Sequence, residues 1–546
     1  MQQNNPKIQR LIDKEIDRLV KEEFIYFLLE KWMISSGEHK NEKYSLKDRP
    51  YMKGIIQDDF PFQVKLKSAQ SGVSEEEVAK AIHRVLKKKG NLLYTFPAGE
   101  QMQQFVDARV RTAVLNNPYL AKFVTGSLNL KKFSLNNNEL YFRGVQKRRQ
   151  IISVDVSSLF ADEIDAYEDD QVIYTLNKRL GAAKDPYKSY FSTPSFHGAG
   201  ISLYYYGSES QRERGSDQRV WTIQCEHCGQ WNEDLLWFEN IRDLNEKNIK
   251  FNFYEPDVIV ICRYCKKPLD RLSSRAEWVA TLTKNSDYCH GHHISKLFTP
   301  TGNLNQMMLD SNDPLKEQEF YNSDLGLPYE PKGSRLTDDV INNCRGTHTI
   351  WIQNRERVKT FGGFDIGAKI HAVASVIEND NRPRIVNVSE LDSWDDLPNY
   401  FSDMRISTAV IDANPDKDEA IEFQKDHEGV WLAYFNQQLE TTPEKYKLNW
   451  DDQIIFIHRT LMMMTVSDLF YEKDIILPIS IQQVRDFYEH LKSPIQAKKQ
   501  DTKGNWISFY PKTRAADHYY FAVLYNIMAT MLKSTSGRVK RAKMVG

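Results

Sequence analysis

The chain lacks any apolar run long enough to span a membrane, and its first residues, Met1-Gln-Gln-Asn-Asn, lack the apolar core of a signal peptide. It also lacks an excess of charge of either sign, because 73 Lys and Arg residues face 74 Asp and Glu residues. A highly charged partner would therefore have to be held by local patches rather than by the field of the whole protein. These absences predict a soluble, cytoplasmic protein that has no membrane partner.

The abundant residues permit a large core. Hydrophobic residues make up 41% and aromatic residues 12% of the 546 residues, which excludes wholesale disorder and suggests about three domains. Apolar positions at helical spacing predict a helix within residues 6–36, and the prolines and glycines of residues 310–360 suit a domain connection. We expect an N-terminal helix in residues 1–40, a first domain over 41–335, a linker over 336–360, a second domain over 361–530 and a disordered basic tail over 531–546.

Two adjacent acids follow an apolar stretch in the first domain. Residues 151–160 are rich in β-branched side chains and predict a buried strand, and Asp162 and Glu163 come directly after it. In an open parallel sheet, ligands bind outside the carboxyl ends of the strands. An Asp at such an end can hold a magnesium ion, and the next Glu can orient a water for attack on a terminal phosphate. A solvated loop after the strand is the plainer interpretation, so the neighbouring segments decide between the two.

Residues 61–75 predict a short strand, a turn of small residues and the start of a helix. The N–H groups at a helix start bind phosphate, but the usual G-x-x-x-x-G-K-[ST] motif is absent here. Gly72 is present and Ser74 stands at the position of the magnesium ligand, whereas Val73 replaces the lysine. The nearest cation is Lys67, just before the turn. The pattern is thus an incomplete phosphate loop.

Further strands are predicted at residues 92–97 and 188–194, and helical segments alternate with the strands of this domain. Such an order is typical of a doubly wound α/β fold with a parallel sheet and a nucleotide at its carboxyl edge. Residues 188–194 end in Ser192-Thr193-Pro194 at the same predicted edge.

Cysteine is scarce, with six residues in the whole chain, and this excludes a disulfide scaffold. Four of the cysteines form two C-x-x-C pairs, Cys225 with Cys228 and Cys262 with Cys265. This spacing predicts a structural zinc site in an insertion of about residues 220–270, because four thiolates leave no open coordination position. A redox pair is the alternative.

The segment Cys289-His-Gly-His-His293 offers further metal ligands. Residues 294–298, which follow it, alternate like a strand, so a histidine that points into the core is the preferred interpretation.

Three isolated carboxylates mark the second domain. Asp365 is the only charge in an apolar strand of a predicted hairpin, Asp412 ends a second apolar strand, and Asp517 lies in the first turn of an apolar helix. Burial of a lone carboxylate on a central strand is costly unless a cation or hydrogen bonds satisfy it. If the three acids converge, they can hold a pair of magnesium or manganese ions for phosphodiester hydrolysis, as in an RNase H-like nuclease. Taken singly, each acid has a plainer explanation, such as the favourable position of Asp517 at a helix start.

In this order, the motifs resemble those of tailed-phage terminase large subunits of the lambda-type (GpA) family. The resemblance covers nearly the whole chain and is carried by Lys67–Ser74, Leu159–Glu163, Ser192–Pro194, Ser216–Arg219, Gly291–Pro300 and Phe320–Pro328. The first of these segments is similar to that family's deviant Walker A loop, in which the lysine stands early. The resemblance therefore implies that Lys67 is the phosphate-binding lysine.

The resemblance also implies roles for the other residues. Lys67, Gly72, Ser74 and Asp162 would bind ATP with Mg²⁺, and Glu163 would be the catalytic base. Asp365, Asp412 and Asp517 would be nuclease residues that bind Mg²⁺ or Mn²⁺, while Cys225, Cys228, Cys262 and Cys265 would hold Zn²⁺.

A member of this family is expected to drive double-stranded viral DNA into a procapsid and to cut concatemeric DNA, in the cytoplasm of an infected bacterial host. Its expected partners are DNA, a small terminase subunit and the portal protein of the procapsid. During packaging, copies of the chain itself are expected to form a homo-oligomeric ring. Two alternatives remain open at the level of the residues. A zinc-bearing transposase or recombinase would explain the acids but not the nucleotide site. A zinc-ribbon DNA-binding scaffold would have neither activity.

Overall fold

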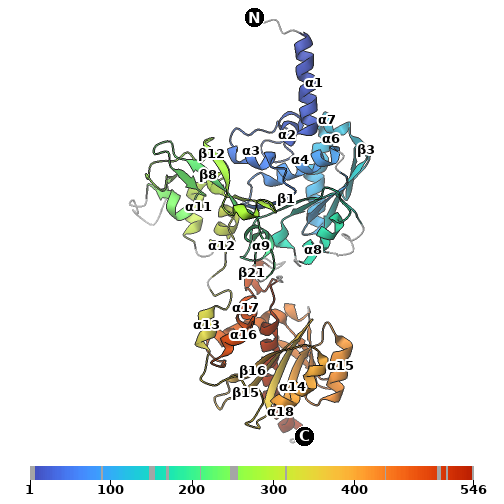
Figure 1. Cartoon of the computed structure of the whole chain (residues 1–546), viewed down its shortest axis with the longest axis vertical. Coiled ribbons are helices and arrows are strands. Elements are labelled where there is room, and N and C mark those ends of the chain that lie inside the picture. The colour runs from blue at the N-terminus through green and yellow to red at the C-terminus, as the bar shows by residue number, and fades with distance from the viewer. Residues whose placement is uncertain are drawn as a thin grey trace. The chain divides into compact units, whose positions relative to one another are not determined.

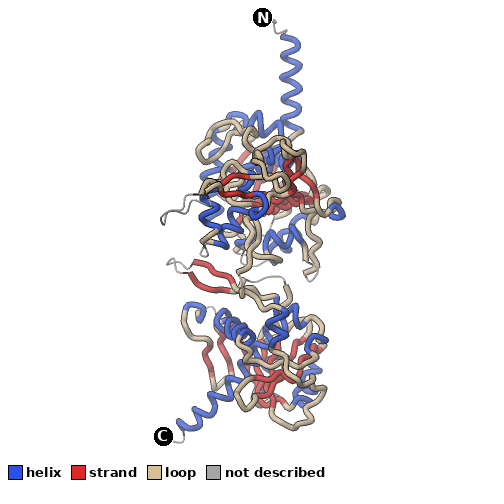
Figure 2. The backbone as a smooth tube through the Cα atoms, turned by 90° about the vertical axis from the view of Figure 1, so that its left-hand side faces the viewer, coloured by secondary structure: helices blue, strands red, loops and turns tan. Residues whose placement is uncertain are grey.

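The computed structural model describes all residues except 1–5, 88–89, 147–153, 168–170, 209–210, 246–255, 314–315, 332, 437, 501–505, 512–514 and 544–546. The chain divides into two compact units, Met1–Pro331 and Lys332–Gly546, and each is described by itself (Figure 1). Most strands of each unit lie centrally with helices around them (Figure 2). Part of the predicted strand 151–160 lies outside the described residues. Within the described part of the chain, no helix is long and apolar enough to cross a membrane.

Two helices stand where the sequence predicted one N-terminal helix. Helix α1 (Pro6–Glu22) and helix α2 (Phe24–Lys31) are separated by Glu23, whose backbone is extended. Phe27 on α2 is fully buried, whereas Leu11 on α1 is exposed. Both views show α1 projecting from the body of its unit (Figure 1, Figure 2).

An eleven-stranded sheet forms the centre of the first unit, in the order β12-β8-β13-β1-β7-β6-β2-β5-β4-β3 with β9 paired to β8. From β8 to β5 every neighbouring pair is parallel, and the pairs at both edges are antiparallel. The predicted α/β fold with a parallel sheet is confirmed, with antiparallel additions at its edges. The strands are β1 (Phe62–Lys67), β2 (Leu92–Phe96), β3 (Val124–Asn129), β4 (Lys132–Leu135), β5 (Asn138–Gly144), β6 (Ser158–Asp162), β7 (Tyr187–Ser192), β8 (Arg219–Gln224), β9 (Trp231–Glu233), β12 (Ala276–Ala280) and β13 (His290–Ile294).

The central strands are buried, although β1 carries Gln63, Lys65 and Lys67 among its apolar residues. Every residue of β1, β2 and β6 is buried, as expected for parallel strands between two layers of helices. Strands β10 (Ile241–Asp243) and β11 (Val258–Val260) form a separate ribbon. The helices and π-helical turns of the unit are α3 (Pro50–Gln57), α4 (Val73–Leu86), α5 (Gly99–Phe105), η1 (Val106–Arg111), α6 (Thr112–Asn116), α7 (Pro118–Ala121), α8 (Gln171–Asn177), α9 (Gly200–Tyr206), α10 (Trp237–Asn240), α11 (Leu304–Ser311), α12 (Glu317–Glu319) and η7 (Phe320–Leu325).

The second unit is built on a seven-stranded sheet in the order β16-β15-β14-β17-β18-β20-β19. Strands β16, β15 and β14 are antiparallel neighbours, whereas β14, β17, β18 and β20 are parallel. The predicted hairpin at residues 361–377 is thus present as β14 and β15. The strands are β14 (Thr360–Ile366), β15 (Ile370–Ile377), β16 (Pro383–Leu391), β17 (Ile406–Asp412), β18 (Val430–Phe435), β19 (Tyr446–Asn449) and β20 (Ile454–Ile457), with a separate hairpin of β21 (Ala497–Gln500) and β22 (Trp506–Phe509).

A long apolar helix, α18 (His518–Lys543), packs directly on the central strand β14. A Cβ atom added to Gly363 of β14 would lie 2.1 Å from the backbone nitrogen of Asn526, so only glycine permits this close approach. Helix α18 also continues through most of the basic tail that was expected to be disordered. The other helices are α13 (Asp338–Asn343), α14 (Leu397–Met404), α15 (Lys417–Asp426), α16 (Arg459–Tyr471) and α17 (Phe487–Lys492).

Candidate nucleotide and metal sites

The predicted phosphate loop, residues 67–74, connects β1 to α4 at the carboxyl edge of the sheet. Gly72 has a φ of +90°, which glycine adopts without strain, and α4 begins at the next residue. The backbone N–H of Ser68 donates to the carbonyl of Ile294 at 2.7 Å, and that of Ala69 donates to the carbonyl of Ser323 at 2.8 Å. Contacts with β13 and η7 therefore hold the loop in place, with the start of α4 facing the same edge.

Lys67 lies beside Glu163, the predicted base. Its Nζ donates to Glu163 Oε1 at 2.7 Å, and the two side chains are 6% and 32% exposed. Although burial lowers the pKa of Lys67, the carboxylates of Glu163 and Asp162 raise it above its ordinary value. Lys67 is therefore a cation, and a ligand phosphate at this loop would compete with Glu163 for it.

The second oxygen of Glu163 contacts the end of β7. Ser192 Oγ and the backbone N–H of Thr193 both donate to Glu163 Oε2 at 3.2 Å. Glu163 itself has a φ of +48°, in the left-handed region that side chains seldom adopt. The carboxylate of Glu163 thus connects Lys67 to the predicted Ser192-Thr193-Pro194 motif. A strained backbone, such as the positive φ of Glu163, is typical of functional positions.

Asp162 has an oxygen that the described protein does not satisfy. The Tyr94 hydroxyl donates to Asp162 Oδ2 at 3.2 Å, whereas Oδ1 is buried without a hydrogen-bond partner among the described residues. Burial and the nearby Glu163 raise the pKa of Asp162 to about 8, against the opposing effect of Lys67. A buried carboxylate oxygen of this kind fits a divalent cation, which would favour its ionised form.

No pattern in the sequence signals the contacts that Arg49 and Tyr51 make with the loop. The Tyr51 hydroxyl donates to the carbonyl of Ser71 at 2.7 Å, and a Cβ atom added to Gly72 would lie 2.9 Å from Arg49 Nη1. Both residues lie at the start of α3, in a segment well before the loop in the chain.

Two acids near the loop anchor other segments. Glu75, next to Ser74, accepts hydrogen bonds from the Trp32 indole at 2.8 Å and the Ser35 hydroxyl at 2.6 Å. Asp165 accepts from the backbone N–H groups of Ser195 and Ile201 at 2.7 and 2.8 Å. Asp165 belongs to the acidic stretch that the sequence singled out, but its role is to fix the segment after β7.

The four cysteines of the two C-x-x-C pairs come together in the predicted insertion of about residues 220–270. Cys225 Sγ lies 3.8 Å from Cys265 Sγ, Cys228 Sγ lies 3.8 Å from Cys262 Sγ, and all four sulfurs lie within 4.8 Å of one another. Sulfurs at about 2.3 Å from a tetrahedral zinc ion are about 3.8 Å apart. Burial raises the pKa of Cys262, but N–H groups of Cys265 and Tyr264 outweigh it and lower that pKa to about 6. The donor set therefore fits Zn²⁺.

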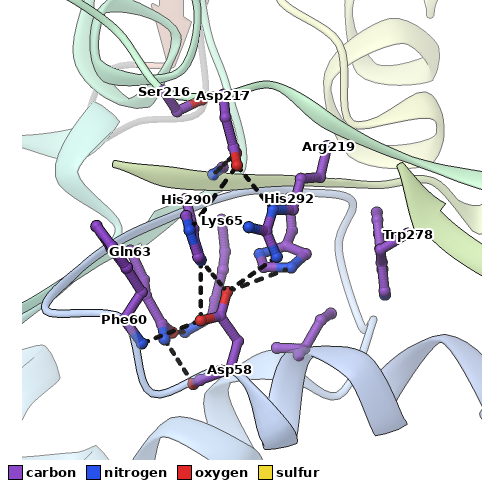
Figure 3. A network of polar contacts seen from close by, with 12 residues as sticks. Asp58, Phe60, Gln63, Lys65, Ser216, Asp217, Arg219, Trp278, His290 and His292 are labelled. Atoms are coloured by element: carbon purple, nitrogen blue, oxygen red, sulfur yellow. Dashed lines mark hydrogen bonds and ion pairs between the residues drawn. The ribbon is translucent and has the colours of Figure 1, made fainter. Parts of the chain in front are cut away.

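The histidine segment forms part of a polar network in the first unit (Figure 3). His290 Nδ1 lies 2.9 Å from Asp58 Oδ2, and Arg219 and His292 approach the same oxygen at 3.6 and 3.8 Å. Asp217 accepts from Arg219 Nε at 2.8 Å. His292 and His293 are buried, in keeping with the interpretation that a histidine of this segment points into the core, and the carboxylates beside them were not predicted.

The strand in this region differs from the predicted one. It is the histidine segment itself that forms β13, whereas residues 296–298 form a turn of 3₁₀ helix. Alternation placed the strand four residues too late because the histidines were counted as polar, and they are buried in the sheet.

Asp365 lies close enough to Asp412 and to Asp517 for its charge to affect both of these acids. Burial and the charge of Asp365 raise the pKa of Asp412 to about 7 and that of Asp517 to about 6. Burial also raises the pKa of Asp365 itself. Asp365 is the last residue but one of β14, Asp412 ends the neighbouring β17, and Asp517 directly precedes α18 rather than lying in its first turn. Among the described residues of this unit, the candidate ligand atoms that lie within 4.8 Å of one another are those of Asp365, His371 and His518, so Asp412 and Asp517 lie near Asp365 without joining one such group.

Histidines that the sequence reading missed surround Asp365. His518 Nδ1 lies 2.8 Å from Asp365 Oδ2, and His371 pairs with Asp365 across the β14–β15 hairpin. The ring of His518 stacks on that of His371 at 4.6 Å. The signal available in the sequence was the short hairpin, since only five residues separate Asp365 from His371.

The chain thus combines a largely parallel sheet that carries a candidate nucleotide loop with a second sheet that has three acids near one edge. Residues 39–280 match the family model of the phage terminase large subunit gpA, ATPase domain. This segment of the chain is therefore similar to the ATPase domain of the phage terminase large subunit gpA. The transposase and scaffold alternatives are not favoured.

One of the solved structures compared has a similar overall fold, and two others match with lower scores. The large terminase of bacteriophage HK97 is 12% identical, with 93% of this chain and 99% of that chain covered and a TM-score of 0.52. The large terminase of a thermophilic bacteriophage in complex with ATP-gamma-S is 10% identical over 88% and 98% of the two chains, with a TM-score of 0.27. The large terminase nuclease of thermophilic phage G20c with bound magnesium is 13% identical over 34% and 95%, with a TM-score of 0.22. No curated protein matches the chain.

Proposed function

We propose that the first unit hydrolyses ATP with Lys67 and Ser74 at the phosphates, Gly72 in the turn and Asp162 as the magnesium ligand. Magnesium, when bound, would neutralise charge on the phosphate oxygens. Glu163 would accept the proton of the attacking water. The supporting observation is the 2.7 Å contact between Lys67 and Glu163, the two residues to which we assign the phosphate cation and the base.

The same carboxylate offers a route from ATP to movement. When a phosphate binds Lys67, Glu163 loses its cation partner while Oε2 still accepts from Ser192 and Thr193. The end of β7 would then respond to the state of the nucleotide. In this proposal the response drives the translocation of double-stranded DNA.

The second unit would cut concatemeric DNA with Asp365, Asp412 and Asp517. Magnesium or manganese held by these acids would supply activation of water and stabilisation of the leaving oxygen. The supporting observation is that Asp365 lies near both other acids and, together with burial, raises their pKa values, an effect that a cation would relieve. Cys225, Cys228, Cys262 and Cys265 would hold zinc for structure alone. A small terminase subunit, a portal protein and a homo-oligomeric ring in the host cytoplasm complete the proposal.

Two assays on one variant test this division of labour. Asp365→Ala should abolish metal-dependent cutting of plasmid DNA, because the central acid is lost, and should leave ATP hydrolysis intact. Asp426→Ala, which changes an exposed acid at the end of α15, is the matched control and should keep both activities. Persistent cutting by Asp365→Ala would refute the nuclease assignment, and absence of ATP hydrolysis in the unaltered protein would refute the ATPase assignment.

A further inference from the structure

Three histidines from three different elements gather beside Asp365. His371 comes from β15, His490 from α17 and His518 from the first position of α18. Their ring centroids lie 4.6 Å apart for His371 and His518, 5.4 Å for His371 and His490, and 5.5 Å for His490 and His518. The predicted nuclease site consists of acids only, so the presence of three histidines beside it requires its own explanation.

Asp365, His371 and His518 have the spacing of ligands to one ion. One ligand atom from each lies within 4.8 Å of the other two. The separation of Asp365 Oδ2 and His518 Nδ1 is 2.8 Å, and neighbouring ligands at about 2.1 Å from one ion are about 3 Å apart. His371 Nδ1 is buried and has no hydrogen-bond partner among the described residues. A buried imidazole nitrogen without a partner is an available ligand atom.

An ordinary hydrogen bond explains only part of this arrangement. It accounts for the contact of His518 with Asp365, but not for the buried His371 Nδ1, which has no hydrogen-bond partner among the described residues. On its other side, His371 Nε2 lies 3.6 Å from Glu390 Oε2. A carboxylate behind an imidazole is the usual second partner of a metal-binding histidine, because it fixes the ring orientation.

We propose that Asp365, His371 and His518 form a transition-metal site that discriminates against Mg²⁺. Two imidazoles and one carboxylate suit ions such as Fe²⁺, Mn²⁺ and Zn²⁺, whereas Mg²⁺ takes oxygen ligands. The proposal rests on the proposed nuclease function in one respect, since Asp365 is shared with the three acids. The ion bound there would be held partly by nitrogen, and the choice of metal would be set by residues outside the acid cluster.

Pulsed electron paramagnetic resonance of the full chain with Mn²⁺ tests this directly. The four-cysteine site is first filled with Zn²⁺, and Mn²⁺ is then added at one equivalent. Nitrogen couplings from directly bound imidazole are expected in the unaltered protein and should be reduced in His371→Ala and His518→Ala. Absence of nitrogen coupling in the unaltered protein would overturn the proposal without any variant having to fold.

Titration calorimetry measures whether the site prefers Mn²⁺ to Mg²⁺. The affinity for Mn²⁺ should fall by about tenfold or more in either variant, whereas the affinity for Mg²⁺ should change by less than about twofold. His427→Ala is the matched control, because His427 stacks on Phe423 at 4.0 Å. Equal losses for both ions would also overturn the proposal. Nitrogen coupling in a protein that cuts no DNA would support the metal site and refute only the nuclease function.

Discussion

The contact of Lys67 with Glu163 makes a prediction about ATP affinity as well as turnover. The 2.7 Å bond must break before the ammonium can bind a phosphate. A hydrogen bond between charged groups contributes about 1.5–3 kcal/mol. Because Glu163 is 32% exposed and partly screened by water, the contribution lies at or somewhat below the lower limit of that range, roughly 1–1.5 kcal/mol. ATP binding by the unaltered protein is weakened by this amount.

Glu163→Gln removes the charge but keeps the shape of the side chain. The variant should bind ATP with Mg²⁺ about 5- to 10-fold more tightly, since about 1.4 kcal/mol corresponds to a factor of ten. Its rate of hydrolysis should fall by at least about 100-fold, because the base is lost. Calorimetry or a fluorescent ATP analogue measures the affinity, and phosphate release measures the rate.

The control is Glu139→Gln, which removes a carboxylate that pairs with Lys132 at 3.3 Å on strands away from the loop. That variant should retain both affinity and rate. If Glu163→Gln binds ATP with unchanged or weaker affinity, the competition between phosphate and carboxylate for Lys67 does not exist. If its rate is unchanged, Glu163 is not the base.

Three further predictions concern other parts of the chain. Gly72→Ala should weaken ATP binding and lower the free energy of unfolding by about 1–3 kcal/mol, because φ is +90° and the new Cβ would lie 2.9 Å from Arg49 Nη1; denaturant titration with and without ATP measures both. Cys262→Ser should reduce zinc from one ion per chain to near zero and lower the melting temperature, as metal analysis and calorimetry would show, and unchanged stability would exclude a structural ion. The folded-state pKa of Asp412 is raised to about 7, so the metal-free protein should lose stability as the pH rises from about 4 to about 7, and Asp412→Asn should remove that part of the slope in denaturation curves. If stability changes equally with pH in Asp412→Asn and in the unaltered protein, the prediction for Asp412 is wrong.

Much of the fold could be predicted because its signals are local. Runs of β-branched residues marked the buried strands, and paired spacing marked the cysteines that meet at 3.8 Å. The histidine strand β13 was misplaced because burial of a polar side chain depends on a carboxylate far away in sequence. His290 lies beside Asp58, which stands more than 200 positions earlier.

Part of the candidate sites could also be predicted from local signals in the sequence. Lys67 and Glu163 could be proposed from the order of strand, turn and acid, but their direct contact could not, because it depends on the register of separate strands. Arg49 and His518 were missed, since neither stands in a pattern that differs from an ordinary surface residue. Their proximity to the sites is a product of tertiary packing alone.

The anchoring of Glu75 has a consequence for the size of an independently stable ATPase domain. The match to the gpA ATPase family begins at residue 39, yet Trp32 and Ser35 bind the carboxylate that follows Ser74. A fragment that starts at the family boundary would leave Glu75 without these donors at the helix that carries the phosphate loop. We therefore expect the functional domain to begin upstream of that boundary and to include Trp32 and Ser35.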